Sequence, residues 1–460
     1  MTAPDPIQSL PVFDASSEFH QNLGLLKVAD LAKAKHGDAV IIRASAVRDM
    51  VLLSGSEAVD YWKAHQGHFQ TELGEIASNA AITRILLGDM LEQPENAALW
   101  DATRRALATV AAEWDRWSER ALTAANAALL EDIAAAGAAP VDLRAICSLW
   151  SVRALVPTLY GQTLPDHEMR EGLMQIEQFY YAMSTRDAAE TAVPTALPEF
   201  RVARDFLDRA TTRALEQAQP GDPSVIGAAL AALPPGLDRP TLLDCLRPTL
   251  GRLLLEKLSI DGLALLWALT HIAQDPALAA DMAAEIGAAQ ADDAGRALSD
   301  ADTPLCFSAV QECLRMYPEL PFIYRITSAP LELHGHVIPV RSTVVFAPWL
   351  VQRDPRYWDR PNSFDGRRFL QPPRIKSAFL PFGIGPRVRA RTQFLQHQLL
   401  TALRSVIAHH ELRLAPKVRL GDLRPILRST LAPRGAVPLC FAPRDAGAAP
   451  APAAFETAET

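Results

Sequence analysis

The chain has 460 residues, of which 49% are hydrophobic and 21% charged, a composition typical of a globular protein. Its formal net charge of −8 argues against general nucleic-acid binding, which needs a basic surface. The N-terminal sequence has no cationic start followed by an apolar stretch, and no run of roughly 18 uncharged apolar residues occurs. We therefore expect a cytoplasmic protein without a membrane anchor. The five cysteines are scattered without zinc-type spacing, which predicts reduced thiols and no metal site.

Most of the chain predicts helices, taken in order. Residues 97–136 are rich in Ala, Leu, Glu and Arg with helical spacing, and helices also fit 141–159 and 166–183. Polar, proline-bearing stretches at 184–198, 220–223 and 234–240 predict loops between them.

Residues 241–273 form a long apolar stretch, in which Pro248 is expected to kink the start. From Leu253 to Ile272 the apolar residues cover most of the helix circumference, which is typical of a helix buried on nearly all sides. A polar connection at 288–302 and a helix at 304–317 follow.

The pattern then changes to short β-prone pieces, an irregular stretch at 351–385 and a last helix at 392–410. The β-prone pieces are 322–327, 331–333, 337–339 and 344–346. The sequence therefore predicts a mainly α fold with small β-sheets around a long buried central helix. We expect residues 1–20 to be an N-terminal extension, 21–445 a single large domain, and 446–460 a disordered Ala/Pro-rich tail.

Glu312 and Arg315 form an ExxR pair whose ends share one face of a helix. Such a pair alone is typical of a surface ion pair. An ordered set follows it: Arg325, Arg353-Asp354-Pro355, Trp358, Pro361, Phe364, Arg368-Phe369 and Pro381-Phe382-Gly383-Ile384-Gly385-Pro386-Arg387. With Trp100 and Arg104 spaced as WxxxR on an earlier helix, the set resembles the cytochrome P450 family over roughly residues 20–443.

The resemblance implies two groups of residues. The first is a buried charge triad behind the cofactor loop, in which loss of one partner strands a charge; its members are Glu312, Arg315 and Arg368. The second group holds the haem propionates through charge-assisted hydrogen bonds. The positions that match the family's anchors are Trp100, Arg104, Arg325 and Arg387.

The cofactor loop departs from the family pattern FGxGxRxCxG at two positions. Arg389 stands where the family has the cysteine that ligates the iron, and Arg391 stands where it has the following glycine. A haem thiolate favours O–O cleavage, whereas a protonated guanidinium has no lone pair for iron. We therefore expect no ordinary haem-thiolate monooxygenation, no required cofactor, and haem only without cysteine ligation.

The central helix departs from the family pattern as well. The resemblance implies an acid followed by an alcohol, which relay protons to bound oxygen. The aligned positions hold Ser259 and Ile260, although a shift of one or two residues would place Asp261 there. The catalytic candidates from sequence are therefore Ser259, Asp261, Arg389 and Arg391.

Two interpretations of the arginines remain open. One is retained anion binding, either of haem held only by its propionates or of another anionic ligand. The other is that the arginines fill the haem space by pairing with carboxylates such as Asp89 or Glu92. Among the histidines, His271 is interpreted as a core residue, and His397 as the best of a poor set of substitute ligands.

Three functions remain open from sequence. Cysteine-less relatives of the family are known as helpers of a glycosyltransferase in natural-product pathways, which makes a haem-free helper the first hypothesis. Its partner would be a glycosyltransferase or carrier protein. A haem-free enzyme is the second, using the cavity for cyclisation, isomerisation or elimination of a small-molecule intermediate. A haem protein with non-cysteine ligation is the third.

Overall fold

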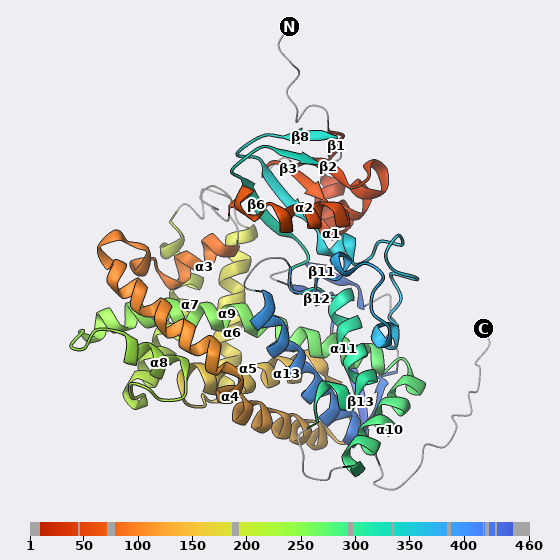
Figure 1. The fold of residues 1–460 in the computed structure, drawn as a ribbon. Helices are drawn as coiled ribbons and strands as arrows, with labels where there is room; N and C mark the ends of the chain where they lie inside the picture. Colours follow the sequence, from red (N-terminus) through yellow and green to blue (C-terminus); the bar gives the residue numbers. More distant parts are fainter. Residues whose placement is uncertain are drawn as a thin grey trace.

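The structure is a computed structural model that describes residues 10–44, 47–70, 79–185, 193–292, 298–333, 335–383, 388–416, 418, 423–427 and 430–444. The α-helices are α1 (Glu18–His36), α2 (Ser56–Ala64), α3 (Asn79–Leu87), α4 (Ala97–Ala136), α5 (Leu143–Tyr160), α6 (Asp166–Thr185), α7 (Pro198–Gln217), α8 (Val225–Ala232), α9 (Arg239–Ile272), α10 (Pro276–Asp292), α11 (Pro304–Met316), α12 (Pro348–Val351) and α13 (Val388–His409). The strands are β1 (Val12–Asp14), β2 (Ala39–Ala44), β3 (Val47–Leu53), β4 (Phe69–Gln70), β5 (Val141–Asp142), β6 (Ile323–Thr327), β7 (Leu331–Leu333), β8 (His336–Ile338), β9 (Thr343–Phe346), β10 (His410–Leu414), β11 (Pro425–Leu427), β12 (Leu431–Pro433) and β13 (Pro438–Pro443). Figure 1 shows a large helical body with a smaller β-rich region at one end.

The largest sheet has six strands in the order β1-β2-β3-β9-β6-β4. Its strands alternate between two buried faces, so Val345 packs with the cluster around α1 while Val344 packs with the cluster around α2. β1, which lies inside the expected N-terminal extension, pairs in parallel with β2. Arg325 of β6 lies opposite Val344 of β9, so the sheet fixes the position of this sequence-predicted anchor.

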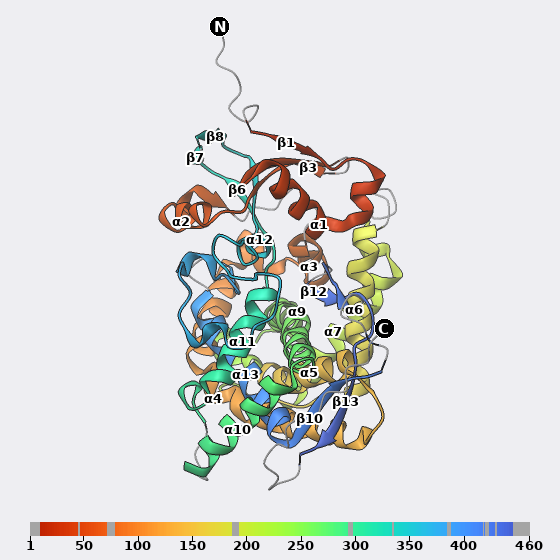
Figure 2. The same ribbon diagram turned by 90° about the vertical axis from the view of Figure 1, so that its right-hand side faces the viewer.

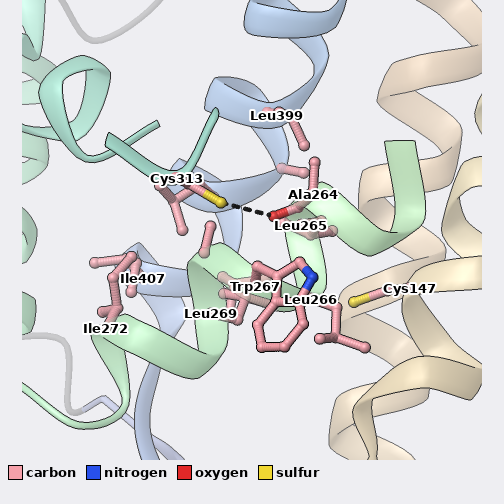
Figure 3. Close-up of a cluster of buried hydrophobic side chains, with 14 of the residues drawn as sticks. Cys147, Ala264, Leu265, Leu266, Trp267, Leu269, Ile272, Cys313, Leu399 and Ile407 are labelled. Carbon is pink, nitrogen blue, oxygen red and sulfur yellow. Dashed lines mark hydrogen bonds between the residues drawn. The ribbon is translucent and has the colours of Figure 1, made fainter. Parts of the chain in front are cut away.

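The central helix α9 has 34 residues and contacts α5, α11 and α13 (Figure 2). The Asp238 side chain caps its start by accepting from the Thr241 backbone N–H at 2.9 Å. Leu265, Leu266 and Trp267 are all buried in the cluster that Figure 3 shows. The prediction of a mainly α fold with small sheets and a long buried central helix is confirmed.

Two helix boundaries differ from the sequence-based expectation. α13 begins at Val388, four residues before the predicted start at Thr392, so the loop is shorter and Arg389 lies in the first turn. α10 extends to Asp292, because the Ala-rich residues at 288–291 continue the helix into the predicted connection. No helix in the described ranges is long and apolar enough to cross a membrane.

Candidate functional site

The four catalytic candidates lie on two helices that contact each other. Ser259 and Asp261 belong to α9, and Arg389 and Arg391 belong to the first turn of α13. The side chains of all four lie outside the described residues, as does Arg387 altogether. The fold therefore brings α9 and α13 into contact, and the packing of their described residues joins Ala264–Ile272 to Leu395–Ile407.

A buried glutamine hydrogen-bonds the backbone at the start of the loop before α13. Gln352 is fully buried, donates from Nε2 to the Arg315 carbonyl at 2.8 Å, and accepts the Leu380 N–H at Oε1 at 2.7 Å. Gly383 has φ +78°, and a Cβ there would lie 2.9 Å from Ile323 Cδ1. Sequence reasoning missed Gln352, because a single glutamine in an irregular stretch carries no signal of burial. Gly383 was visible in the FGxG spacing.

The predicted triad lies behind this loop. Arg315 Nε lies 2.6 Å from Glu312 Oε2, Arg368 Nε lies 3.0 Å from the same oxygen, and Glu312 and Arg315 are fully buried. Arg315 also donates to the carbonyls of Gln352 and Pro361 at 2.5 and 2.8 Å. Every charge in the group therefore has a partner, which is the condition under which buried ions are tolerated.

Arg325 of β6 is half-buried and has an aromatic neighbour instead of an acid. Its Nη1 donates to the Tyr324 carbonyl at 2.7 Å, and its guanidinium carbon lies 4.9 Å from the centre of the Trp62 ring. Among the described ion pairs none involves Arg325, and burial lowers its pKa below the usual value. A desolvated guanidinium without a carboxylate favours an anionic ligand.

The other anchor positions lie on α4. Trp100 is 38% exposed and Arg104 is exposed, one helical turn further along the same face. Asp89 and Glu92, the carboxylates considered as partners for the arginine cluster, instead approach Arg84 at 3.6 and 2.9 Å. These two acids therefore form ion pairs with Arg84 of α3.

The histidines considered as ligands have other roles in the described structure. His271 Nε2 lies 2.9 Å from the Tyr317 hydroxyl, and its ring stacks on Phe364 with centroids 4.6 Å apart. Burial, with the charges of Arg353 and Arg315, lowers the pKa of His271 to about 4. His397 is partly exposed and lies 3.4 Å from Glu119 of α4.

The aromatic stack that contains His271 includes a second residue that sequence reasoning missed. Arg353 packs against Trp349, with its guanidinium carbon 3.4 Å from the ring centre, and desolvation lowers its pKa to about 9. Trp267 stacks on Tyr317 at 4.1 Å with the rings nearly parallel. The only sequence signal for this group was the RDP spacing of Arg353, which did not indicate its aromatic neighbours.

Comparison with known proteins gives the family. The sequence profile described as cytochrome P450 matches residues 263–432. Human mitochondrial sterol 26-hydroxylase is 31% identical over 204 residues, which are 43% of this chain and 38% of that protein. The 2-hydroxyisoflavanone synthase of Glycine max is 31% identical over 161 residues, 32% of this chain and 30% of that protein. The chain thus matches well under half of the length of each relative.

Solved structures extend the likeness in fold over most of the chain. A zebrafish cytochrome P450 solved with abiraterone superposes with a TM-score of 0.72 at 19% identity. The superposition covers 91% of this chain and 98% of the other. A second structure of a zebrafish cytochrome P450, solved with progesterone, gives a TM-score of 0.68 at 18% identity.

These findings correct one expectation, that no cofactor is required. Cytochromes P450 are haem proteins, so the family profile and the structural neighbours point to haem. The physical reason for the error is that a missing cysteine removes the axial ligand only. Arg325 fits a haem propionate, because no aspartate or glutamate forms an ion pair with it among the described residues. The segment from Phe382 to Arg391, in contrast, contains no cysteine that could ligate the iron.

Residues 263–432, which the profile matches, include the end of α9, the buried Glu312–Arg315 pair and Gln352, and the first superposition covers 91% of the chain. On this evidence the chain belongs to the cytochrome P450 superfamily.

Proposed function

We propose that this chain has lost haem-thiolate monooxygenation and acts as a helper or partner protein in a natural-product biosynthetic pathway, with haem held by its propionates. The observation that carries the proposal is the absence of cysteine from residues 382–391, where the family pattern requires one. A thiolate is the ligand that pushes electron density to iron for O–O cleavage, and arginine cannot replace it.

The remaining cysteines support this reading, because the two nearest in sequence are committed elsewhere. Cys313 of α11 is fully buried and donates from Sγ to the Ala264 carbonyl at 3.3 Å (Figure 3). Burial, and then the charge of Glu312, raise the pKa of its thiol. Cys440 lies in β13, opposite Arg413 of β10. A thiolate from either residue would need a rearranged core or sheet.

The start of α13 supports an anionic ligand over a cationic one. A helix N-terminus carries partial positive charge, which stabilises a thiolate and opposes an arginine. The first turn of α13 contains Arg389 and no acidic residue. An anion such as a haem carboxylate would offset this positive charge. Arg325 of β6, the strand whose Ile323 lies beside Gly383, would add a second favourable charge for that anion.

The first test is the visible spectrum of the purified protein during titration with hemin. We expect a saturable Soret band whose reduced carbon monoxide complex lacks the red shift of thiolate ligation. Arg325→Gln is expected to weaken hemin binding by about tenfold, because a charge-assisted hydrogen bond is lost. Arg374→Gln, at an 81% exposed side chain, is the matched control and should leave the affinity unchanged.

The outcome that contradicts the loss of monooxygenation is a thiolate-type spectrum in the unmodified protein. The helper role is tested separately by co-purification with the glycosyltransferase or carrier protein of the same pathway. A stable stoichiometric complex is expected. Conversion of a pathway intermediate by the chain alone, without NADPH or redox partners, would favour the non-redox enzyme instead.

A further inference from the structure

Two oxidisable aromatic side chains in the helical body are each hydrogen-bonded to a base. The Tyr317 hydroxyl lies 2.9 Å from His271 Nε2, and Trp349 Nε1 donates to Asp30 Oδ1 at 3.0 Å. Phenol and indole rings are the aromatic side chains that lose one electron most readily. Inside a protein the resulting positive charge is costly, so the O–H or N–H proton must leave with the electron. A hydrogen-bonded base therefore decides which buried ring can be oxidised.

Both bases are in the protonation state that this chemistry needs. Burial, and then the charges of Arg353 and Arg315, lower the pKa of His271 to about 4, so its imidazole is neutral at pH 7. Its Nε2 accepts a proton when the neutral ring carries its hydrogen on Nδ1. Burial raises the pKa of Asp30 above its usual value, which makes its carboxylate a stronger proton acceptor than an exposed aspartate.

Arg353 links the two rings. Its guanidinium carbon lies 3.4 Å from the Trp349 ring centre and 5.9 Å from the Tyr317 ring centre. It also donates a short hydrogen bond to the carbonyl of Met316, the residue before Tyr317. A planar group in contact with both rings gives an electron a short route between them. Its positive charge opposes a second positive charge on either ring, which couples each oxidation to proton loss.

Two neighbouring tryptophans lack such a base. Trp267 of α9 stacks on Tyr317 at 4.1 Å, but its Nε1 donates to the Leu431 carbonyl at 2.9 Å, and a carbonyl does not take up a proton at neutral pH. Trp358 lies under the Arg315 guanidinium at 5.3 Å, and its Nε1 has no hydrogen-bond partner within the described ranges. An oxidising equivalent that reaches Tyr317 therefore stops there.

We propose that Trp349 and Tyr317 form a proton-coupled electron-transfer path that leads from the partly exposed Asp30 on α1 to the central helix. A one-electron oxidant of the metal-complex class takes an electron from Trp349, whose Nε1 proton passes to Asp30. Trp349 then takes an electron from Tyr317 and recovers its proton from Asp30, while the Tyr317 proton moves to His271 Nε2. The oxidant is reduced by one electron, and the products are a neutral tyrosyl radical and an imidazolium.

Photo-oxidation followed by freeze-quench electron paramagnetic resonance tests the path on the full chain, without haem or a partner. The oxidant is tris(bipyridine)ruthenium, activated by light in the presence of persulfate. We expect a tyrosyl signal with a component that Tyr317→Phe removes, because phenylalanine keeps the stacking on Trp267 and lacks the hydroxyl. Trp349→Phe is expected to remove the same component although Tyr317 is present. Trp358→Phe, at a similarly buried ring without a base, is the matched control and should leave it unchanged.

Asp30→Asn and His271→Gln test the proton acceptors, because each keeps a hydrogen-bonding oxygen and removes the base. Both are expected to lose the Tyr317 component, which a purely structural role of these pairs would not cause. If Trp349→Phe does not fold, Asp30→Asn decides whether the path begins at Trp349.

Three results overturn the proposal. They are a tyrosyl signal that Tyr317→Phe leaves unchanged, a Tyr317 component that persists in both base variants, and an equal loss of that component in Trp358→Phe and Trp349→Phe. Because no haem is used, the result is independent of the spectroscopic test of the proposed function.

Discussion

The Glu312 carboxylate joins two arginines and the backbone N–H of Asp365, which donates to it at 3.0 Å. This group lies in the scaffold and keeps the residue types that the family uses, whereas the ligand position does not. The proposed loss of monooxygenation thus rests on single residues such as Arg389, and it is testable one residue at a time.

Glu312→Gln is expected to lower the free energy of unfolding by about 3–5 kcal/mol, because it leaves the buried Arg315 without its counter-ion. Urea denaturation measures this directly. Glu411→Gln, whose partner Arg413 lies 3.5 Å away at the surface, is the control and should change stability by under about 1 kcal/mol. Equal losses of unfolding free energy in the two variants would show that burial of the Glu312 charge does not determine its contribution to stability.

Arg389→Cys is expected to create thiolate ligation, which we propose the unmodified chain lacks. The triad and the Gln352 support are present, and a cysteine in the first turn of α13 has its thiolate favoured by the helix N-terminus. The readout is a red-shifted Soret band of the reduced carbon monoxide complex after hemin loading. Arg391→Cys, two residues further along the helix, is the control; a thiolate signal from it instead would mean that the assigned register is wrong.

At the scale of elements, the contact between α9 and α5 is set by a glycine. A Cβ on Gly262 would lie 2.8 Å from the Cys147 carbonyl oxygen of α5, a backbone atom that cannot move aside. Gly262→Ala should therefore destabilise the protein by roughly 1–3 kcal/mol despite the better helix propensity of alanine.

The control for that change is Gly287→Ala in α10, where the added methyl group would meet no described side chain or other element within 4 Å. It should stabilise the protein by roughly 0.5–1 kcal/mol through helix propensity alone. Thermal unfolding of both variants checks the pair. Shifts of the same sign would contradict the close approach of α9 and α5.

At the scale of the whole molecule, His271 predicts acid sensitivity. Its pKa is about 4 in the folded protein and 6.5 when unfolded, so the unfolded state binds the extra proton first. The stabilisation is complete above pH 6.5 and is lost as pH falls from 6.5 to 4, by roughly 3 kcal/mol. Urea denaturation at several pH values measures the slope.

His271→Gln isolates this contribution, because it keeps a polar group near Tyr317 and removes the titration. The variant should show a flatter dependence of stability between pH 6.5 and 4 than the unmodified chain. Asp38 and Asp354, whose pKa values are lowered by Arg356 and Lys33, add further loss in more acidic solution in both proteins. An unchanged slope between pH 6.5 and 4 in the variant would contradict the contribution assigned to His271.

The sequence by itself determined the mainly helical class, the buried α9, the order of motifs around Glu312 and the missing cysteine, because helical periodicity and residue order are local properties of the chain. It misplaced the start of α13, since the family pattern assigned Arg389 and Arg391 to the cofactor loop although arginine itself favours helix. Its inference that no cofactor is needed was wrong, because one missing ligand says little about the rest of the cradle.

Only the tertiary structure decided which distant residues meet. Nothing near Gln352 in the sequence indicates that it joins α11 to Leu380, and nothing near Arg204 indicates that it caps α3 across 118 residues. Arg325 was placed by its family position, but the absence of an acid among its described contacts follows from the packing of β6 against Trp62. Such contacts depend on how separate elements fold onto each other, and no local pattern in the chain records that.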